Sequence, residues 1–291
     1  ERVLSGDVDF VLHTGDISYA NMDESHWDQF CRDIEPIAAR VPFMTVPGNH
    51  ESPGNFSAYR GRMWMPQPGD GAPSDGFYHS FMAGPVSFIN LDDNTMFAGI
   101  NVSPTQQRWL GTQLAAATAK RNLIITAQHH PLYCSNPERD CRNQAAQMRG
   151  WLEPMFNEHK VALNLCGHMH SYERVLPTYE NKLVSANYSN AGAPAYVING
   201  AGGTHEGYAK FPKAGEPVAP WSAVRLRVAP VAMAYKVHIH RRRHAPAETR
   251  RFAGTFDWAA VRAELGALWR VARNTVVEYI DADGDVVRVT S

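Results

Sequence analysis

The stretch Gly15-Asp16-Ile17-Ser18-Tyr19 decides the fold of this chain, because it follows the apolar run Phe10-Val11-Leu12 where a buried strand is expected to end. Ligands of open α/β sheets gather outside the carboxyl ends of the strands. An aspartate at this place offers two oxygens that can bridge two cations, and a tyrosinate is a hard oxygen donor suited to a ferric ion. Taken alone, the pentapeptide also fits a plain turn, since Gly and Asp are common turn residues.

The composition is that of a globular chain long enough for one large α/β domain. The chain has 291 residues, of which 44% are hydrophobic and 20% charged, with a formal net charge of -1. The near-neutral charge gives no reason to expect nucleic-acid or membrane-surface binding, and no apolar run approaches transmembrane length. There is neither a signal peptide nor an initiator methionine, so we expect that residue 1 is not the start of the gene product.

The cysteines and the glycosylation sequons favour a secreted protein. Cys134 and Cys141 lie in one loop and are close enough in sequence to close a small disulfide ring. Cys31 and Cys166 are predicted to be buried free thiols. Because no pair has CxxC spacing, a zinc-thiolate site is not expected. The Asn-x-Ser/Thr sequons are at Asn55, Asn101 and Asn187.

Hydrophobic periodicity predicts alternating strands and helices. Strands are expected at 9–14, 43–46, 77–82, 85–91, 123–126, 161–165 and 196–198. Helices are expected at 24–39, from Ser103 to about Lys120, and at 144–158. Residues 52–76 are rich in Pro, Gly and Ser and are predicted to form a long loop, of the kind that is functional or ordered by the site it covers.

Several of these strands end in residues that commonly bind metals. They are Asp16 with Tyr19, Asn49 with His50, His129, and His168 with His170. A single histidine after a strand is usually a surface or core residue, but a repeated coincidence of this kind is improbable by chance. Residues two apart in an extended segment point the same way, so His168 and His170 could reach one site. The set mixes oxygen and nitrogen donors without thiolate, which suits a pair of metals such as Fe, Zn or Mn.

The chain resembles the metallophosphoesterases in a series of motifs, each placed after a strand. In order, they are Gly15-Asp16-x-x-Tyr19, Gly48-Asn49-His50-Glu51, His129-x-Pro131 and Gly167-His168-x-His170. Tyr19 and the segment Ser171-Tyr172-Glu173-Arg174 narrow the resemblance to the purple acid phosphatases, of the large type found in plants, fungi and other eukaryotes. The resemblance covers roughly residues 8–222. It implies an α/β/β/α sandwich of two mixed sheets flanked by helices.

The resemblance also implies which residues hold a binuclear Fe(III)–M(II) centre, where M is Zn, Mn or Fe. Asp16 would bridge the two metals, and Tyr19 and His170 would complete the ferric side. The divalent metal would be held by Asn49, His129 and His168. Two cations can clamp both ends of an in-line displacement and turn a bound water into hydroxide.

Two further residues would act on the substrate. His50 lies beside a metal ligand and would contact the phosphate and act as general acid toward the leaving alkoxide. Arg139, in the loop between Cys134 and Cys141, could contact phosphate, although a solvated loop charge is the alternative. The implied reaction is phosphate monoester hydrolysis, as in an acid phosphatase.

Two features of the family are missing from the sequence. An aspartate on a preceding strand should also bind the ferric ion, and a parallel neighbour strand needs a crossover of about a dozen residues or more. Only 15 residues precede Asp16. The N-terminal β-sandwich domain of the large members is absent as well. We therefore expect an N-terminally incomplete chain that lacks the first strand and has weak or no activity.

The resemblance divides the chain into a catalytic domain at 1–222, an atypical Arg/Ala-rich insert at 223–273 and a C-terminal strand segment at 274–291. The insert contains Arg241-Arg242-Arg243-His244 and is interpreted as a solvated or disordered insert, or as a mistranslated intron or frame error. His238 and His240 alternate within it but are not assigned to a metal site.

The alternative functions are other hydrolytic reactions at the same site, or binding without catalysis. A phosphodiesterase, a nucleotide pyrophosphatase or a phytase could share the dimetal core, and an inactive binding protein is the alternative from a different class. The expected partners are small-molecule phosphate esters, without nucleic acid or membrane, and a homodimer is compatible with these expectations. The expected location is secreted, extracellular or vacuolar.

Overall fold

The computed structural model describes most of the first 226 residues and three short strands beyond them. The described residues are 6, 8–67, 76–94, 103–137, 140–188, 191–202, 206–207, 209–211, 219–226, 238–241, 275–280 and 286–290. Arg139 and the sequon at Asn101 lie outside them, as does most of the segment 223–273. The interpretations of that segment as solvated chain or frame error therefore also concern residues outside the described part.

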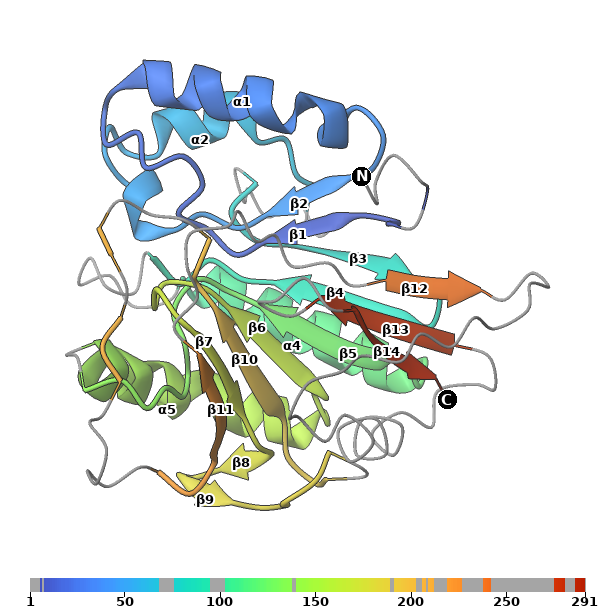
Figure 1. The fold of residues 1–291 in the computed structure, drawn as a ribbon. Coiled ribbons are helices and arrows are strands. Elements are labelled where there is room, and N and C mark those ends of the chain that lie inside the picture. The colour runs from blue at the N-terminus through green and yellow to red at the C-terminus, as the bar shows by residue number, and fades with distance from the viewer. Residues whose placement is uncertain are drawn as a thin grey trace.

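Helices and strands form layers (Figure 1). The helices α1 (Glu24–Ala38) and α2 (Ser57–Arg62) lie over the parallel strands β1 (Val11–His13) and β2 (Phe43–Thr45). A seven-stranded mixed sheet forms the next layer. The helices α4 (Pro104–Ala119) and α5 (Ala145–Glu158) complete the arrangement. The predicted sandwich of two sheets flanked by helices is confirmed.

The seven-stranded sheet contains strands from both halves of the described chain. Its members are β3 (His79–Ala83), β4 (Val86–Asn90), β5 (Leu123–Ala127), β6 (Leu163–Cys166), β7 (Tyr172–Val175), β10 (Ala195–Asn199) and β11 (Ser222–Leu226). Their spatial order is β11-β7-β10-β6-β5-β4-β3. The pairs β4–β5, β5–β6 and β6–β10 are parallel. Because parallel strands end at the same edge, the turns after β5 and β6 lie beside each other.

Two smaller sheets stand outside this layer. Strands β8 (Thr178–Tyr179) and β9 (Lys182–Leu183) form an antiparallel pair. Strands β12 (His238–Arg241), β13 (Thr275–Ile280) and β14 (Val286–Thr290) form an antiparallel sheet of three.

The core between the two sheets consists of apolar side chains from both of them. Phe10 lies at its centre, with its ring 5.1 Å from the rings of Phe81 and Phe88 in edge-on contacts. Leu12 and Met44, from β1 and β2, belong to the same buried cluster. Aromatic pairs of this geometry add about 0.5–1.5 kcal/mol each beyond the burial of their area. This core fixes the β1–β2 pair against the larger sheet.

Local sequence signals explain where two of the helices begin. Ser103 caps α4 by accepting the N–H of Thr105, and Pro104 occupies the first turn, where its missing N–H costs nothing. Asp23 caps α1 in the same way by accepting the N–H of Ser25 at 3.0 Å. Pro36 lies inside the last turn of α1, and the helix ends two residues later.

Some elements differ from the prediction. The segment predicted as a long loop at 52–76 contains α2, which begins after Asn55 and Phe56, both in left-handed backbone conformations. Strand β7 was not predicted, because Glu173 breaks the apolar pattern that marks a buried strand. The Glu173 carboxylate is buried because it accepts hydrogen bonds from the N–H of Ser135 and the hydroxyl of Ser222.

The predicted disulfide between Cys134 and Cys141 is present. Cys31 and Cys166 are free thiols, and Cys166 is buried whereas Cys31 is only half-buried. The prediction of two buried thiols is therefore correct for Cys166 alone.

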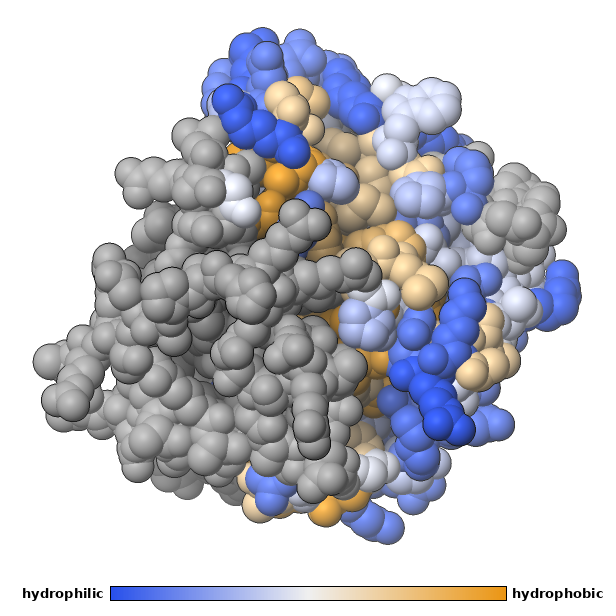
Figure 2. Space-filling view, turned by 90° about the vertical axis from the view of Figure 1, so that its right-hand side faces the viewer, coloured by the Kyte–Doolittle hydropathy of each residue, from blue (hydrophilic) through white to orange (hydrophobic). Residues whose placement is uncertain are grey.

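The polarity of the exposed surface varies over one face of the molecule. Figure 2 shows hydrophilic residues across the top of the molecule, at the height of α1, and hydrophobic residues below them at the height of the strand layers. None of the helices that the structure describes combines the length and the apolar character that a membrane crossing requires.

Candidate metal centre and active site

The turns that carry the motif residues meet at one edge of the two sheets. Strands β1 and β2 pair in parallel from Val11 opposite Phe43 to His13 opposite Thr45, so the turns that follow them are neighbours. The turns after β5 and β6 are neighbours for the same reason. The candidate ligands predicted from the sequence are therefore brought together at the carboxyl ends of the strands, as expected for this class of fold.

Close backbone contact between the first two turns requires glycine. A Cβ atom on Gly48 would clash with the backbone and carboxylate of Asp16. A Cβ atom on Gly15 would collide with the backbone of Gly48, and Gly15 also has a left-handed φ of 87°. The two glycines of the motifs thus bring Asp16 and Asn49 within reach of one another.

The buried carboxylate of Glu51 joins the same two turns. Its Oε2 accepts the N–H of Asp16 at 2.8 Å and that of Gly48 at 2.7 Å, and its Oε1 accepts the N–H of Ile17 at 2.8 Å. Burial and the nearby charge of Asp16 raise the pKa of Glu51 to about 7. Glu51 belongs to one of the sequence motifs, but nothing in the sequence indicates that its carboxylate would join the two turns.

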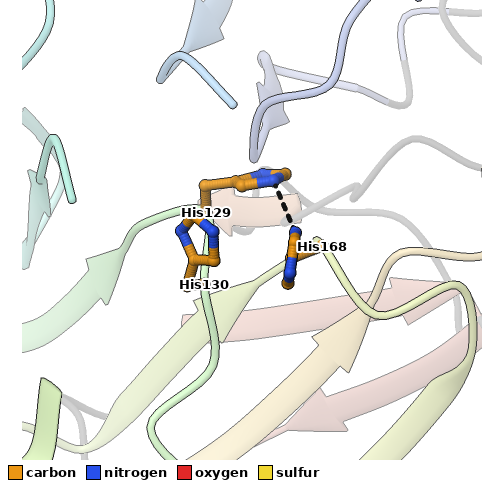
Figure 3. Close-up of side chains that lie close together, drawn as sticks. All are labelled: His129, His130 and His168. Carbon is orange, nitrogen blue, oxygen red and sulfur yellow. Dashed lines mark hydrogen bonds between the residues drawn. The ribbon is translucent and has the colours of Figure 1, made fainter. Parts of the chain in front are cut away.

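Asn49, His129 and His168 form one half of the centre. The Asn49 Oδ1 lies 3.0 Å from His129 Nε2 and 3.0 Å from His168 Nδ1, and the two imidazole nitrogens are 3.2 Å apart (Figure 3). The Nδ1–H of His129 donates to the carbonyl of Thr14 at 2.7 Å. That hydrogen bond leaves Nε2 directed at the Asn49 oxygen and the His168 nitrogen.

Tyr19 and His170 form the other half. The Tyr19 hydroxyl lies 2.9 Å from His170 Nε2. The Nδ1–H of His170 donates to the carbonyl of Gly207 at 2.9 Å, which fixes the ring with Nε2 toward the tyrosine. An imidazole held by a backbone carbonyl through one nitrogen is the usual arrangement of a metal-binding histidine.

Asp16 lies between the two halves. Its Oδ2 is 3.2 Å from His129 Nε2 and 3.4 Å from the Tyr19 hydroxyl, while its Oδ1 accepts the N–H of His50 at 3.0 Å. Burial opposes ionisation of Asp16, but the charge and hydrogen bond of His129 and the hydrogen bond from His50 outweigh it and lower its pKa. Burial also opposes the charge of His129, and the facing Asp16 nevertheless raises the pKa of His129 to about 9.

His50 lies at the edge of this cluster. Its Nδ1–H donates to Asn21 Oδ1 at 2.8 Å, its Nε2 is 3.5 Å from Glu206 Oε1, and its ring centre is 4.2 Å from that of Tyr19. The side chain of His50 is 16% exposed. Sequence reasoning missed Asn21 and Glu206. Asn21 could have been noticed as a polar side chain in the same turn as Tyr19, whereas Glu206 follows no recognisable signal.

The backbone at several ligand positions is in the left-handed region. The φ angles are 54° at Asp16, 51° at Tyr19 and 62° at His168. For residues other than glycine, such conformations cost about 1–3 kcal/mol each and cluster at functional sites. The expectation that His168 and His170 alternate along an extended segment is therefore wrong. His168 turns toward Asn49, whereas His170 turns toward Tyr19.

The donor set fits a pair of metal ions. A carboxylate lies between a cluster of one amide oxygen with two imidazoles and a cluster of one phenol with one imidazole. Such mixed oxygen and nitrogen donors suit hard and borderline metals. The orientation of His129 and His170 by backbone carbonyls supports the same interpretation.

Comparisons with known proteins agree with this geometry. Residues 1–172 match the family model described as calcineurin-like phosphoesterase, and residues 193–231 match the one described as iron/zinc purple acid phosphatase-like protein C. Acid phosphatase type 7 of Homo sapiens is 37% identical in an alignment 246 residues long that covers 76% of this chain and 53% of the relative. Probable purple acid phosphatase 20 of Arabidopsis thaliana is 32% identical in an alignment 217 residues long that covers 72% of this chain and 48% of the relative. The chain thus spans about half the length of these relatives.

Solved structures share the fold. The purple acid phosphatase PPD1 isolated from yellow lupin seeds aligns with a TM-score of 0.69 and 22% identity over 99% of this chain and 48% of that chain. GAP50 of Plasmodium, the anchor in the inner membrane complex, aligns with a TM-score of 0.58 and 15% identity over 99% of this chain and 80% of that chain. At such identities the two structures support the architecture alone. The family model over residues 1–172 shows that the chain belongs to the calcineurin-like phosphoesterase family, and the match of residues 193–231 together with the named relatives places it in the purple acid phosphatase branch.

Proposed function

We propose that the protein hydrolyses phosphate monoesters as an acid phosphatase, at a centre of one ferric ion and one divalent ion of zinc, manganese or iron. The observation that supports this proposal most strongly is the convergence of oxygen and nitrogen donors from four turns in one cluster. The proposed ligands are Asp16, Tyr19, Asn49, His129, His168 and His170.

Each proposed ligand has a role that follows from its position. Asp16 would be shared by the two ions, because its Oδ2 is within 3.4 Å of donors from both halves of the cluster. Tyr19 and His170 would hold the ferric ion. The divalent ion would be held by Asn49, His129 and His168. When bound, the two cations polarise the phosphoryl oxygens and lower the pKa of a bound water.

His50 is proposed to protonate the leaving alkoxide. Its Nδ1–H is held by Asn21, so Nε2 is the nitrogen available to hold and release a proton at the edge of the cluster. The Tyr19 ring packs against the imidazole and restricts its rotation. Because His50 also donates its backbone N–H to Asp16, the proposed acid and the proposed bridge are fixed relative to each other.

The remaining assignments stay proposals. Arg139 is proposed to contact the substrate phosphate. We propose that the chain is divided into a catalytic domain at 1–222, an insert at 223–273 and a C-terminal strand segment at 274–291. A secreted or vacuolar location is supported by the disulfide between Cys134 and Cys141, since such bonds persist in oxidising compartments. Small phosphate esters are the proposed substrates, and a homodimer the proposed assembly.

Monoester hydrolysis is favoured over the other reactions considered, because the relatives described above are named acid phosphatases. A phosphodiesterase, nucleotide pyrophosphatase or phytase would use the same cluster, but no feature of the described residues selects one of them. An inactive binding protein is favoured by the missing aspartate of the ferric side, but it would have no need for His50 beside the six donors that are present.

The test uses the full-length protein purified with its metals. We expect two metal ions per chain, one of them iron, and hydrolysis of p-nitrophenyl phosphate with an optimum below neutral pH. Removing the metals with a chelator should abolish turnover, and adding ferric and zinc ions should restore it. Full metal occupancy without monoester hydrolysis would overturn the proposal and support a binding role.

A further inference from the structure

His130 is buried beside the proposed divalent side but is not one of the predicted ligands. It is 2% exposed and follows the proposed ligand His129 directly in the chain. The rings of these two neighbours are nearly perpendicular, at 86°, so His130 points in a different direction from His129. Figure 3 shows His130 below His129 and to one side of His168.

The ring of His130 packs against the ring of His168. Their centres are 4.1 Å apart, with an angle of 45° between the planes. This is closer than the contact of either ring with His129, at 4.8 Å and 5.0 Å. His168 approaches Asn49 through Nδ1, so the rotation of its ring about the Cβ–Cγ bond decides whether that nitrogen faces the cluster.

The carboxylate of Asp93 holds His130 in place. A single oxygen, Oδ2, accepts the backbone N–H of His130 at 2.6 Å and lies 3.3 Å from its ring Nδ1. Asp93 itself is fully buried. One carboxylate oxygen therefore accepts a hydrogen bond from the main chain of His130 and lies within ion-pair distance of its ring.

The segment that carries Asp93 is itself anchored at both sides of the centre. The N–H of Leu91 donates to the carbonyl of Ala127 at 2.8 Å, which extends the pairing of β4 with β5. The Nδ2 of Asn94 donates to the carbonyl of Pro47 at 2.6 Å, in the turn that leads to Asn49. The support under His130 is thus connected to the turns of two proposed ligands.

From these contacts we infer that His130, held by Asp93, is a positioning residue that keeps the ring of His168 turned with Nδ1 toward Asn49 and His129. The inference rests on the proposed function, because it concerns a proposed ligand of the divalent metal. His130 acts through ring packing and does not itself bind the metal. Groups that orient metal ligands typically change metal affinity about 10–100-fold when they are removed.

The test measures zinc affinity of the metal-stripped protein by competition with a chromophoric chelator. His130→Ala removes the packing ring and should weaken zinc binding about 10–100-fold. His130→Phe keeps a flat ring of similar size and should restore most of the affinity. Asp93→Asn keeps an oxygen for the backbone N–H and should have a small effect, whereas Asp93→Leu should resemble His130→Ala.

Two internal references separate ring packing against His168 from a general loss of structure. The visible band of an iron–tyrosinate pair reports on Tyr19 and His170, and it should be unchanged in the His130 variants. His79→Ala removes another fully buried histidine, on β3, and should lower the unfolding temperature without changing zinc affinity. If the wild-type protein binds neither zinc, manganese nor iron, the proposed function fails and not this inference alone.

The inference is overturned if zinc affinity in folded His130→Ala equals that of the wild type, or if His79→Ala weakens zinc binding equally. It is also overturned if His130→Phe binds as poorly as His130→Ala and the cobalt-substituted protein loses one nitrogen ligand. That result would make His130 a ligand, which its position within 4.8 Å of ligand atoms of His129 and His168 allows as a competing interpretation.

Discussion

The carboxylate of Glu51 accepts the backbone N–H of Asp16 at 2.8 Å, across 35 positions of the chain. Because the same oxygen also accepts the N–H of Gly48, one buried side chain fixes the distance between two turns that supply proposed metal ligands. Glu51 thus contributes to the centre without being one of its ligands.

We expect Glu51→Gln to destabilise the protein and to lower its metal content. An amide offers one oxygen where the carboxylate offers two, so at least one of the three backbone N–H groups would face an NH2 group. A buried donor left without a partner costs about 1–3 kcal/mol. Thermal unfolding and elemental analysis measure both effects. Glu35→Gln, at an exposed position of α1, is the control and should change neither. Normal metal content and stability in Glu51→Gln would show that the clamp is dispensable.

Tyr19→Phe should abolish the visible absorption of the iron-loaded protein, because the phenolate is the proposed source of charge transfer to the ferric ion. The ring contact with His50 would be kept, so the position of the proposed acid should change little. Absorption spectroscopy makes the measurement. Tyr179→Phe, on β8, serves as the control and should keep the band. A band that persisted in Tyr19→Phe would rule out the assignment of this residue.

His50→Gln should lower kcat about 10²–10⁴-fold while the metal content stays normal, as expected for loss of a general acid. The loss should be larger for an alkyl phosphate than for p-nitrophenyl phosphate, because a poor leaving group depends more on protonation. Steady-state kinetics on both substrates tests this difference. An equal loss on the two substrates would point to phosphate binding as the role of His50.

His79 should make folding stability depend on pH. Burial lowers the pKa of His79 from 6.5 to about 3, and the Asn90 amide donates to its Nε2 at 2.8 Å. The unfolded chain therefore binds a proton at a pH where the folded protein does not. The stability contributed by neutral His79 is complete above pH 6.5 and is lost as the pH falls toward 3.

The corresponding measurement is urea unfolding at pH 7 and pH 5 for the wild type and for His79→Phe. The phenylalanine does not titrate, so the variant should lose about 2 kcal/mol less than the wild type between these pH values. His13, whose pKa is lowered to about 4 by burial, should leave part of the pH dependence in place. Identical pH dependence in both proteins would show that His79 titrates normally in the folded state.

Removal of the disulfide by the paired change Cys134→Ser and Cys141→Ser should cost about 2–3 kcal/mol, the chain-entropy value for so short a loop. The N–H of Ser135, beside one cysteine, donates to the buried carboxylate of Glu173, so the loss should extend to β7. Denaturant unfolding under reducing and oxidising conditions measures the effect. Cys31→Ser, at a free thiol, is the control. Equal stability with and without the bond would limit its role to the loop itself.

The sequence predicts which turns carry the proposed ligands, because these residues follow strands whose apolar runs are easy to recognise. Asp16 and His129 are 113 positions apart, yet parallel pairing within each sheet and packing of the two sheets against each other place both turns at one edge. The supporting groups could not be predicted in the same way. Glu51 and Asp93 act through contacts with backbone N–H groups, and such contacts depend on the packing of segments that have no fixed spacing in sequence.

Local conformation accounts for most of the remaining differences. Helix α2 lies in a segment whose Pro, Gly and Ser content suggests a loop, and packing of Tyr59 into the core overrides that weak preference. Strand β7 places the charged residue Glu173 at a buried position, whereas buried strands usually consist of apolar residues. Its burial is explained by hydrogen-bond partners that the sequence does not reveal. The left-handed turn at His168 could not be predicted from the sequence, because such conformations are uncommon outside glycine even in histidine, where they are enriched.

The left-handed backbone at Asp16, Tyr19 and His168 lowers the stability of the fold at three positions whose side chains are proposed metal ligands. Glycine at any of these places would relieve the backbone strain and so stabilise the fold. The same substitution would remove a proposed metal ligand. Laboratory evolution that selects only for heat resistance would therefore drift toward well-folded chains with dismantled centres. Selection must include turnover in every round if the evolved descendants are to keep these side chains.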